Sequence, residues 1–144
     1  MIRRLHPIAG GLSLATILVF WLSTVASELS GSSPIIVAVK QAIPWGFLLL
    51  VPAIAVAGAS GFRLGKGWRG PLVAAKRRRM PIIALNGICV LVPCALALAY
   101  LSSEGRFDSL FYIVQAVELI AGAGNMLLMA LSLRDGLRIR HRQA

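Results

Sequence analysis

The chain has 144 residues, of which 58% are hydrophobic and 14% charged, and its mean hydropathy is +0.80. A soluble domain of this length needs a polar shell, and too few polar residues are present to build one. The formal net charge of +10 would suit a nucleic-acid-binding protein. However, the basic residues flank apolar runs and no nucleic-acid-binding fold is readable, so a membrane protein without a nucleic-acid partner is predicted.

The first apolar run covers residues 7–27 and is long enough to cross a hydrocarbon core of about 30 Å as a helix. Two arginines precede it, and small residues stand just before Glu28. These features also fit a secretory signal peptide with a cleavage site. The run is long for a signal peptide and carries two large aromatic residues in its second half. A retained transmembrane helix is therefore preferred, with cleavage as the alternative.

The second apolar run covers residues 34–58 and contains Pro44 and Pro52. A proline inside a helix removes one backbone donor and tends to kink the helix. Membrane helices tolerate this where neighbouring groups satisfy the freed carbonyl. We therefore expect one bent helix rather than two short ones.

Residues 59–80 form the polar centre of the chain, with seven basic residues and no acidic one. Four glycines predict that the first half of this segment is a loop. The stretch from Gly61 to Lys66 superficially resembles a phosphate-binding loop. Its glycine spacing is one residue short, and Gly67 stands where a Ser or Thr must bind magnesium. Nucleotide binding is therefore rejected.

Residues 81–101 form the third apolar run and residues 109–133 the fourth, and a basic tail covers residues 134–144. No linker separates the chain into domains, and the loops are too short to fold alone. The sequence therefore predicts an all-α, polytopic membrane protein that consists of a single bundle of four transmembrane helices.

The basic residues are distributed unevenly across the predicted membrane. Thirteen of the 15 Lys and Arg residues fall on one side, and Arg106 alone stands on the other. The positive-inside rule then places both termini in the cytoplasm. The basic residues of the central segment are expected to contact anionic lipid head groups, at about 1 kcal/mol per charge. These residues are Arg63, Lys66, Arg69, Lys76, Arg77, Arg78 and Arg79.

The fourth run carries Gln115, Glu118, Gly122 and Asn125 at steps of three and four, so all four residues share one helix face. Lipid offers these residues no hydrogen-bond partner, so the face must meet protein or water. Glu118 lies roughly 14 Å below the non-cytoplasmic end of its helix. The depth of this carboxylate makes it the most informative residue of the chain.

Lys40 is the only basic residue inside an apolar run, and it lies roughly 9 Å below the same end of its own helix. We hypothesise that Lys40 pairs with Glu118, with Gln41 and Gln115 as supporting hydrogen-bond partners. The pair either only fixes the packing of the helices or serves as a working proton or ligand site, and the packing role is favoured.

Asn86 in the third run and Asn125 in the fourth are expected to hydrogen-bond each other between antiparallel helices. Gly122 would let a neighbouring helix approach closely beside them. This contact is interpreted as structural rather than functional.

His6 lies at the predicted cytoplasmic interface, and a neutral imidazole there could bind haem iron. His141, in the basic tail, is the only other histidine, so a haem held by two histidines would need His6 from both copies of a dimer. An interfacial histidine near lipid phosphates is the preferred interpretation. No metal site and no cofactor are expected, with haem b as a minor alternative.

No motif for nucleophilic, zinc-dependent or phosphate chemistry is present, so an enzyme is not expected. The overall pattern is similar to that of small four-helix inner-membrane proteins of bacteria. The leading hypothesis is a non-enzymatic accessory or assembly bundle that binds a membrane-protein partner or forms a homo-oligomer. The first alternative is a small transporter or proton relay that uses Glu118 and Lys40. The second is a dimeric haem-binding redox protein that uses His6.

Overall fold

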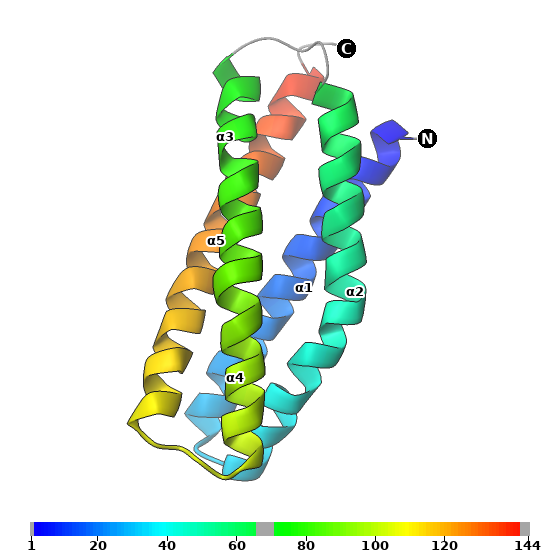
Figure 1. Cartoon of the computed structure of the whole chain (residues 1–144). Helices are drawn as coiled ribbons and strands as arrows, with labels where there is room; N and C mark the ends of the chain where they lie inside the picture. The colour runs from blue at the N-terminus through cyan, green and yellow to red at the C-terminus, as the bar shows by residue number, and fades with distance from the viewer. Residues whose placement is uncertain (1, 66–70, 142–144) are drawn as a thin grey trace.

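A computed structural model describes residues 2–65 and 71–141 of the chain. Within these residues the protein is all-helical and has no strand. Its elements are α1 (Ile2–Ser30), α2 (Ser33–Gly65), α3 (Pro71–Asn86), the π-helical turn η1 (Gly87–Leu91), α4 (Val92–Ser103) and α5 (Ser109–His141). Because α3, η1 and α4 follow one another without a break, they form a single long rod (Figure 1).

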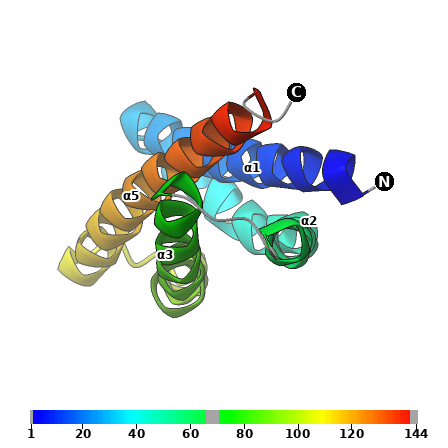
Figure 2. The same ribbon diagram turned by 90° about the horizontal axis from the view of Figure 1, so that it is seen from above.

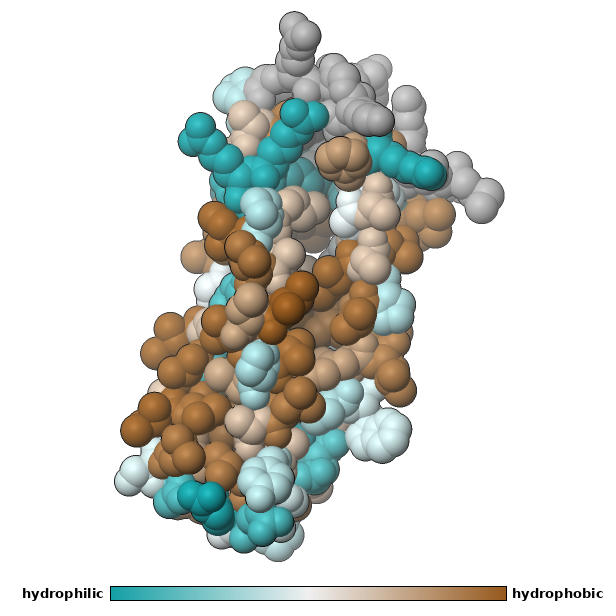
Figure 3. All heavy atoms as spheres, viewed as in Figure 1, coloured by the Kyte–Doolittle hydropathy of each residue, from teal (hydrophilic) through white to brown (hydrophobic). Residues whose placement is uncertain are grey.

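Among the described residues, four helical segments are long and apolar enough to cross a membrane, namely Leu5–Ser30, Ser33–Leu64, Val73–Ser103 and Ser109–Arg138. The shortest has 26 residues, more than the roughly 20 that a bilayer requires. On the face shown in Figure 3, apolar residues form a belt across the middle of the bundle, and hydrophilic residues gather toward its two ends. The all-α fold with four candidate spans is confirmed, and it indicates a multi-pass membrane protein.

The bundle has two chemically different ends. At one end α1 begins, α2 ends, α3 begins and α5 ends (Figure 1). We call this the basic end, because Arg63 and the run Lys76–Arg79 lie there. We call the opposite end, with the α1–α2 turn and the α4–α5 loop, the hairpin end. Both described termini therefore lie at the basic end.

The helices pack as two pairs that diverge toward the basic end. α1 packs along α2, and α5 contacts α3, η1 and α4. α2 contacts the long third rod through α4, near the hairpin end. Seen from above, α1 and α5 cross, whereas α2 and α3 stand apart (Figure 2). Contacts at the basic end must therefore bridge the separation between the two pairs.

The chain reverses direction at the hairpin end through two glycines, and a carboxylate caps the helix that follows the second turn. Gly31 and Gly105 adopt φ values of +63° and +67°, which residues with a side chain seldom tolerate. The Asp108 carboxylate accepts the backbone N–H of Phe111 at 3.1 Å and thereby caps the start of α5. The Arg106 side chain, at 2.9 Å, and the Phe111 N–H hold the pKa of Asp108 below its usual value.

Helix continues where the glycines of residues 59–80 predicted a loop. α2 ends only at Gly65, and α3 begins at Pro71. Continued helix satisfies the backbone groups internally, which outweighs a cost of about 1 kcal/mol for each glycine. A side chain is also excluded at Gly61 by its surroundings, because a Cβ there would lie 2.8 Å from Cε1 of His6 on α1. The glycine thus permits close contact between α1 and α2.

The prolines of the bundle are accommodated in two ways. Pro44 and Pro52 lie inside α2, which remains one helix and bends along its length, as predicted (Figure 1). In the third rod, the π-helical turn Gly87–Leu91 precedes Pro93, and the N–H of Val92 reaches the carbonyl of Gly87. A proline ring clashes with the carbonyl four residues earlier in a regular α-helix, and the wider turn relieves this crowding.

The apolar core is small and lies near the hairpin end. Its packed cluster consists of Ile36, Leu98, Leu101 and Phe111, and the other buried apolar residues are spread along the helices. Large apolar side chains are exposed around the bundle, which is the expected arrangement where lipid is the solvent. In the described interior, eleven buried polar residues stand beside twelve apolar ones. The functional chemistry is therefore to be sought inside the bundle.

Candidate functional site: two buried polar clusters

One face of α5 is polar along most of its length and is turned into the bundle. Gln115, Asn125, Ser132 and Asp135 are each between 2 and 6% exposed. The side chain of Glu118, on the same face, is 13% exposed. From Gln115 to Asp135 the helix rises about 30 Å, which matches the thickness of a hydrocarbon core. This polar face is therefore long enough to extend across a hydrocarbon core.

Lys40 of α2 and Glu118 of α5 form an ion pair inside the bundle. The Nζ of Lys40 donates to Oε2 of Glu118 at 2.7 Å and to Oγ1 of Thr24, on α1, at 3.3 Å. Lys40 is only 1% exposed, so its long side chain does not extend to the surface. The structure thus brings together the two residues that the sequence analysis paired, and it adds Thr24 as a third contact.

A second carboxylate acts on the same ammonium group. Glu28 follows Thr24 by one turn of α1 and interacts electrostatically with Lys40. Its Oε1 atom is buried and has no hydrogen-bond partner in the described part of the chain. Lys40 makes its ion pair with Glu118, whereas Glu28 acts on the ammonium only from beyond ion-pair distance. If both carboxylates are ionised, Lys40 neutralises only one of their two negative charges. The sequence analysis placed Glu28 outside the first span, although its position one turn after Thr24 indicates the same helix face.

The two glutamines near the pair are arranged differently from expectation. Gln41 does not support Lys40, because its Nε2 donates to the backbone carbonyl of Ala99 on α4 at 2.5 Å. Gln115 is buried one turn from Glu118, and neither Oε1 nor Nε2 of its amide has a partner among the described residues. An unsatisfied buried amide costs roughly 1–3 kcal/mol, so water or another ligand is expected beside it.

We name this group the Lys40 cluster, and its members are Thr24, Glu28, Lys40, Gln115 and Glu118. The cluster joins α1, α2 and α5 within the hairpin-end half of the bundle.

The polar face of α5 is interrupted at Gly122. The indole Nε1 of Trp21, on α1, donates to the backbone carbonyl of Leu119 at 3.0 Å. A Cβ added to Gly122 would lie 3.2 Å from Cδ1 of the same ring. Gly122 thus provides the close approach that the sequence predicted, and Trp21 is the group that uses it.

Asn86 and Asn125 do not hydrogen-bond each other, although the sequence predicted that they would. The Nδ2 of Asn86 donates to the backbone carbonyl of Ala121 at 2.9 Å. Asn125 lies one helical turn farther along α5, so the two amides are offset by about 6 Å. The Oδ1 of Asn125 is buried without a partner in the described residues.

A second polar cluster lies toward the basic end. On α1, the Nδ1 atom of His6 lies 2.9 Å from the carbonyl of Ala57 and 3.2 Å from Oγ of Ser60, both on α2. Its Nε2 atom lies 3.1 Å from Nζ of Lys76 on α3. A carbonyl only accepts and an ammonium only donates. Nδ1 therefore carries the hydrogen, and Nε2 accepts from Lys76.

Asp135 of α5 completes this second cluster. Its Oδ2 accepts from Nη1 of Arg79 at 2.6 Å, and its side chain is 3% exposed. Nε of Arg134 lies 3.7 Å from Oδ1, and Lys76 interacts with the carboxylate electrostatically. We name this group the Lys76 cluster, with members His6, Ser60, Lys76, Arg79 and Asp135. It bridges the α1–α2 pair to α3 and α5.

Two of the seven basic residues assigned to lipid head groups are thus engaged inside the protein. Lys76 contacts His6, and Arg79 contacts Asp135. Arg63, Arg77 and Arg78 have exposed side chains, whereas Lys66 and Arg69 lie outside the described residues. The sequence signal for this arrangement was Asp135, the single acidic residue within the basic segments.

Both ring nitrogens of His6 are occupied by protein groups. A haem iron at His6 would therefore have to displace either Lys76 or the α2 contacts. Among the described residues, no group of three or more His, Cys, Asp or Glu side chains could hold a metal ion.

No protein-family model matches the chain, and no curated protein or solved structure matches it either. The four candidate spans indicate a small multi-pass membrane protein, and the described residues place charged groups in its interior.

Proposed function

We propose that this chain is a small inner-membrane protein, with both termini in the cytoplasm, that relays protons through its interior. The proposal is carried by the buried ion pair of Lys40 with Glu118 and by the nearby carboxylate of Glu28, whose Oε1 is buried without a partner among the described residues. The orientation follows from the basic end, because exposed arginines mark the cytoplasmic side of membrane helices.

The Lys40 cluster has the charge balance of a proton-exchange site. Ionisable residues inside a membrane are costly and commonly mark ion or proton pathways. Lys40 can neutralise one carboxylate, and a proton can neutralise the other. Moving that proton between Glu28 and Glu118 would leave the net charge of the cluster unchanged. The unpartnered amide of Gln115 supports a bound water molecule beside Glu118.

The polar face of α5 offers a route from this cluster toward the basic end. The Oδ1 of Asn125 and the Oγ of Ser132 are buried and lack partners in the described structure, so each can bond water. The route would continue through Asp135, which interacts electrostatically with Lys76, to His6, whose Nε2 accepts a hydrogen bond from Lys76. The contact between Trp21 and Gly122 interrupts this route, so proton passage would require that contact to move.

The test is proton flux into vesicles that contain the purified full-length chain. A pH jump is imposed across the membrane, and a pH-sensitive dye inside the vesicles reports the flux. We expect the wild type to conduct above protein-free vesicles. Glu118→Gln and Glu28→Gln should both reduce the flux to the protein-free level, because an amide cannot take up the proton.

Glu104→Gln is the matched control, because Glu104 is exposed in the α4–α5 loop at the same end of the bundle. It should conduct like the wild type. Equal flux in Glu118→Gln and the wild type would exclude the relay. A wild type that conducts no faster than protein-free vesicles would exclude it as well.

The same ion pair also favours a second candidate, an accessory or assembly bundle in which the charges only fix helix packing. α2 and α5 make few contacts besides Lys40 and Glu118, so this pair sets how the two helices align. Lys40→Met combined with Glu118→Leu separates the candidates. A double variant that remains folded and still captures a membrane partner or a second copy in mild detergent would support the packing role.

A further inference from the structure

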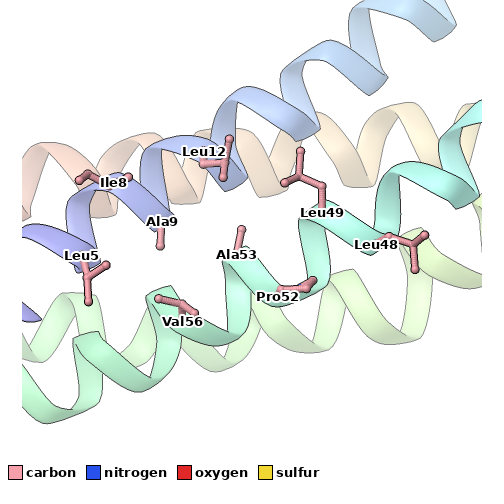
Figure 4. A pocket seen from close by; sticks show the side chains of 9 residues that line it. All are labelled: Leu5, Ile8, Ala9, Leu12, Leu48, Leu49, Pro52, Ala53 and Val56. Carbon is pink, nitrogen blue, oxygen red and sulfur yellow. The ribbon is translucent and has the colours of Figure 1, made fainter.

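A shallow apolar groove runs along the outside of the bundle between α1 and α2 (Figure 4). Its volume is about 270 Å³. Leu5 and Leu12 line it on α1, and Leu48 and Val56 line it on α2. The small side chains of Ala9 and Ala53, each 7% exposed, leave the space between the two helices unfilled.

The groove covers one half of the bundle. α2 rises about 12 Å between Leu48 and Val56. Leu48 stands near the middle of α2 (Ser33–Gly65), whereas Val56 and Leu5 lie toward the basic end. The hydrocarbon of one membrane leaflet is about 15 Å thick. The groove therefore matches one acyl chain of the leaflet at the basic end and stops near the middle of the bilayer.

At its basic end the groove continues into a second hollow, which reaches Arg63. Val56 lines both hollows, and Ala59, Ser60 and Arg63 line the second one. Arg63 is exposed and lies about 10 Å beyond Val56 along α2, at the depth expected for lipid head groups. Asp135, the only acidic residue near this end, is buried. The apolar groove thus ends in a positively charged surface.

We propose that this groove binds one anionic phospholipid of the adjacent leaflet. The acyl chain lies against Ala9 and Ala53, and the phosphate lies at Arg63. Three features carry this assignment, namely the apolar lining, the length of one leaflet and the positive charge where the groove opens. The proposal does not rest on proton transfer, because none of these residues belongs to the Lys40 cluster.

The test is native mass spectrometry of the full chain after reconstitution in an equal mixture of phosphatidylglycerol and phosphatidylcholine. The wild type should retain one lipid and prefer phosphatidylglycerol. Arg63→Gln should lower that preference about fivefold, the effect of one interfacial charge. Val56→Phe should lose the retained lipid, because the ring fills the junction of the two hollows.

Each variant has a matched control. Arg78→Gln removes an exposed arginine of α3 at the same end, and Val51→Phe adds the same ring to α2 outside the groove. Both should behave like the wild type. An unchanged preference in Arg63→Gln would overturn the proposal, and so would equal lipid loss in Val56→Phe and Val51→Phe. If Val56→Phe instead converts a dimer to a monomer with its lipid retained, the groove seats a second copy and the proposal is wrong.

Discussion

The Lys40 cluster and the Lys76 cluster place similar charges at different depths of one bundle. Lys40 and Glu118 are 1% and 13% exposed, within the apolar belt. Arg79, which pairs with Asp135 near the basic end, is 23% exposed. A basic side chain that loses its partner at the basic end can turn to water or lipid phosphate, whereas Lys40 cannot. Depth, rather than the number of contacts, should therefore set the cost of breaking each cluster.

The largest effect on stability is expected when one partner of the Lys40–Glu118 ion pair is removed. Glu118→Leu and Lys40→Met should each destabilise the fold by roughly 3–5 kcal/mol, because each leaves the other member of the buried ion pair without its partner. The double variant should recover most of that loss. Unfolding in mixed micelles measures the three free energies. If the single variants lower the free energy of unfolding no more than surface substitutions do, the Lys40 cluster is not the costlier of the two clusters to break.

A smaller effect on stability is expected for the ion pair of Arg79 and Asp135 in the Lys76 cluster. Asp135→Asn removes the charge that Arg79 contacts at 2.6 Å, and it should cost about 2 kcal/mol. Arg134→Gln is the control, because Arg134 is 56% exposed and lies 3.7 Å from Asp135; it should change stability by less than about 0.5 kcal/mol. If Asp135→Asn costs as much as Glu118→Leu, depth does not determine the cost.

The close approach of α1 to α2 at the Lys76 cluster can be tested with two glycines. A Cβ at Gly61 would meet His6, so Gly61→Ala should shift the imidazole and cost about 1 kcal/mol. Gly58 has nothing within 4 Å of its added Cβ, so Gly58→Ala should stabilise the helix by about 0.5–1 kcal/mol. Unfolding experiments should give opposite signs. The same sign for both would show that His6 is not held against α2.

The smallest effect concerns Asp108, outside both clusters. Its pKa lies below the ordinary value of 3.8 because Arg106 and the Phe111 N–H stabilise the carboxylate. This stabilisation is fully present above the ordinary pKa, and it is lost as the pH falls through the lower pKa of the folded state. Chemical-shift titration of a side-chain-labelled sample measures that pKa. Arg106→Gln should move it upward, and an unmoved pKa would contradict the assignment.

The Lys40 cluster was easier to predict from the sequence than the Lys76 cluster. Lys40 and Glu118 are charges within apolar runs at similar depths, and only a partner makes such burial tolerable. Their contact therefore follows from the sequence, although its function remains a prediction. The carbonyl bonded by Gln41 could not be foreseen, because the rotation of α4 depends on the packing of the whole bundle.

The Lys76 cluster was not predicted, because its basic residues fit a pattern that is common to most membrane proteins. Basic residues beside a span usually set orientation and contact lipid phosphates, and Lys76 and Arg79 were interpreted in that way. Composition also placed residues 59–65 in a loop, and this hid Ser60 as a helical neighbour of His6. Only the extended helices bring His6, Lys76 and Asp135 to one level of the bundle.

The position of Glu28 and Thr24 before Lys40 in the chain has a consequence for biosynthesis. Glu118 follows Lys40 by 78 residues, so at 5–20 residues per second the ribosome needs roughly 4–16 s to make it. Thr24 and Glu28 are already present when Lys40 is made, and both interact with its ammonium in the finished protein. They can therefore accompany the lysine during insertion into the bilayer, until α5 arrives and Glu118 takes its place in the ion pair.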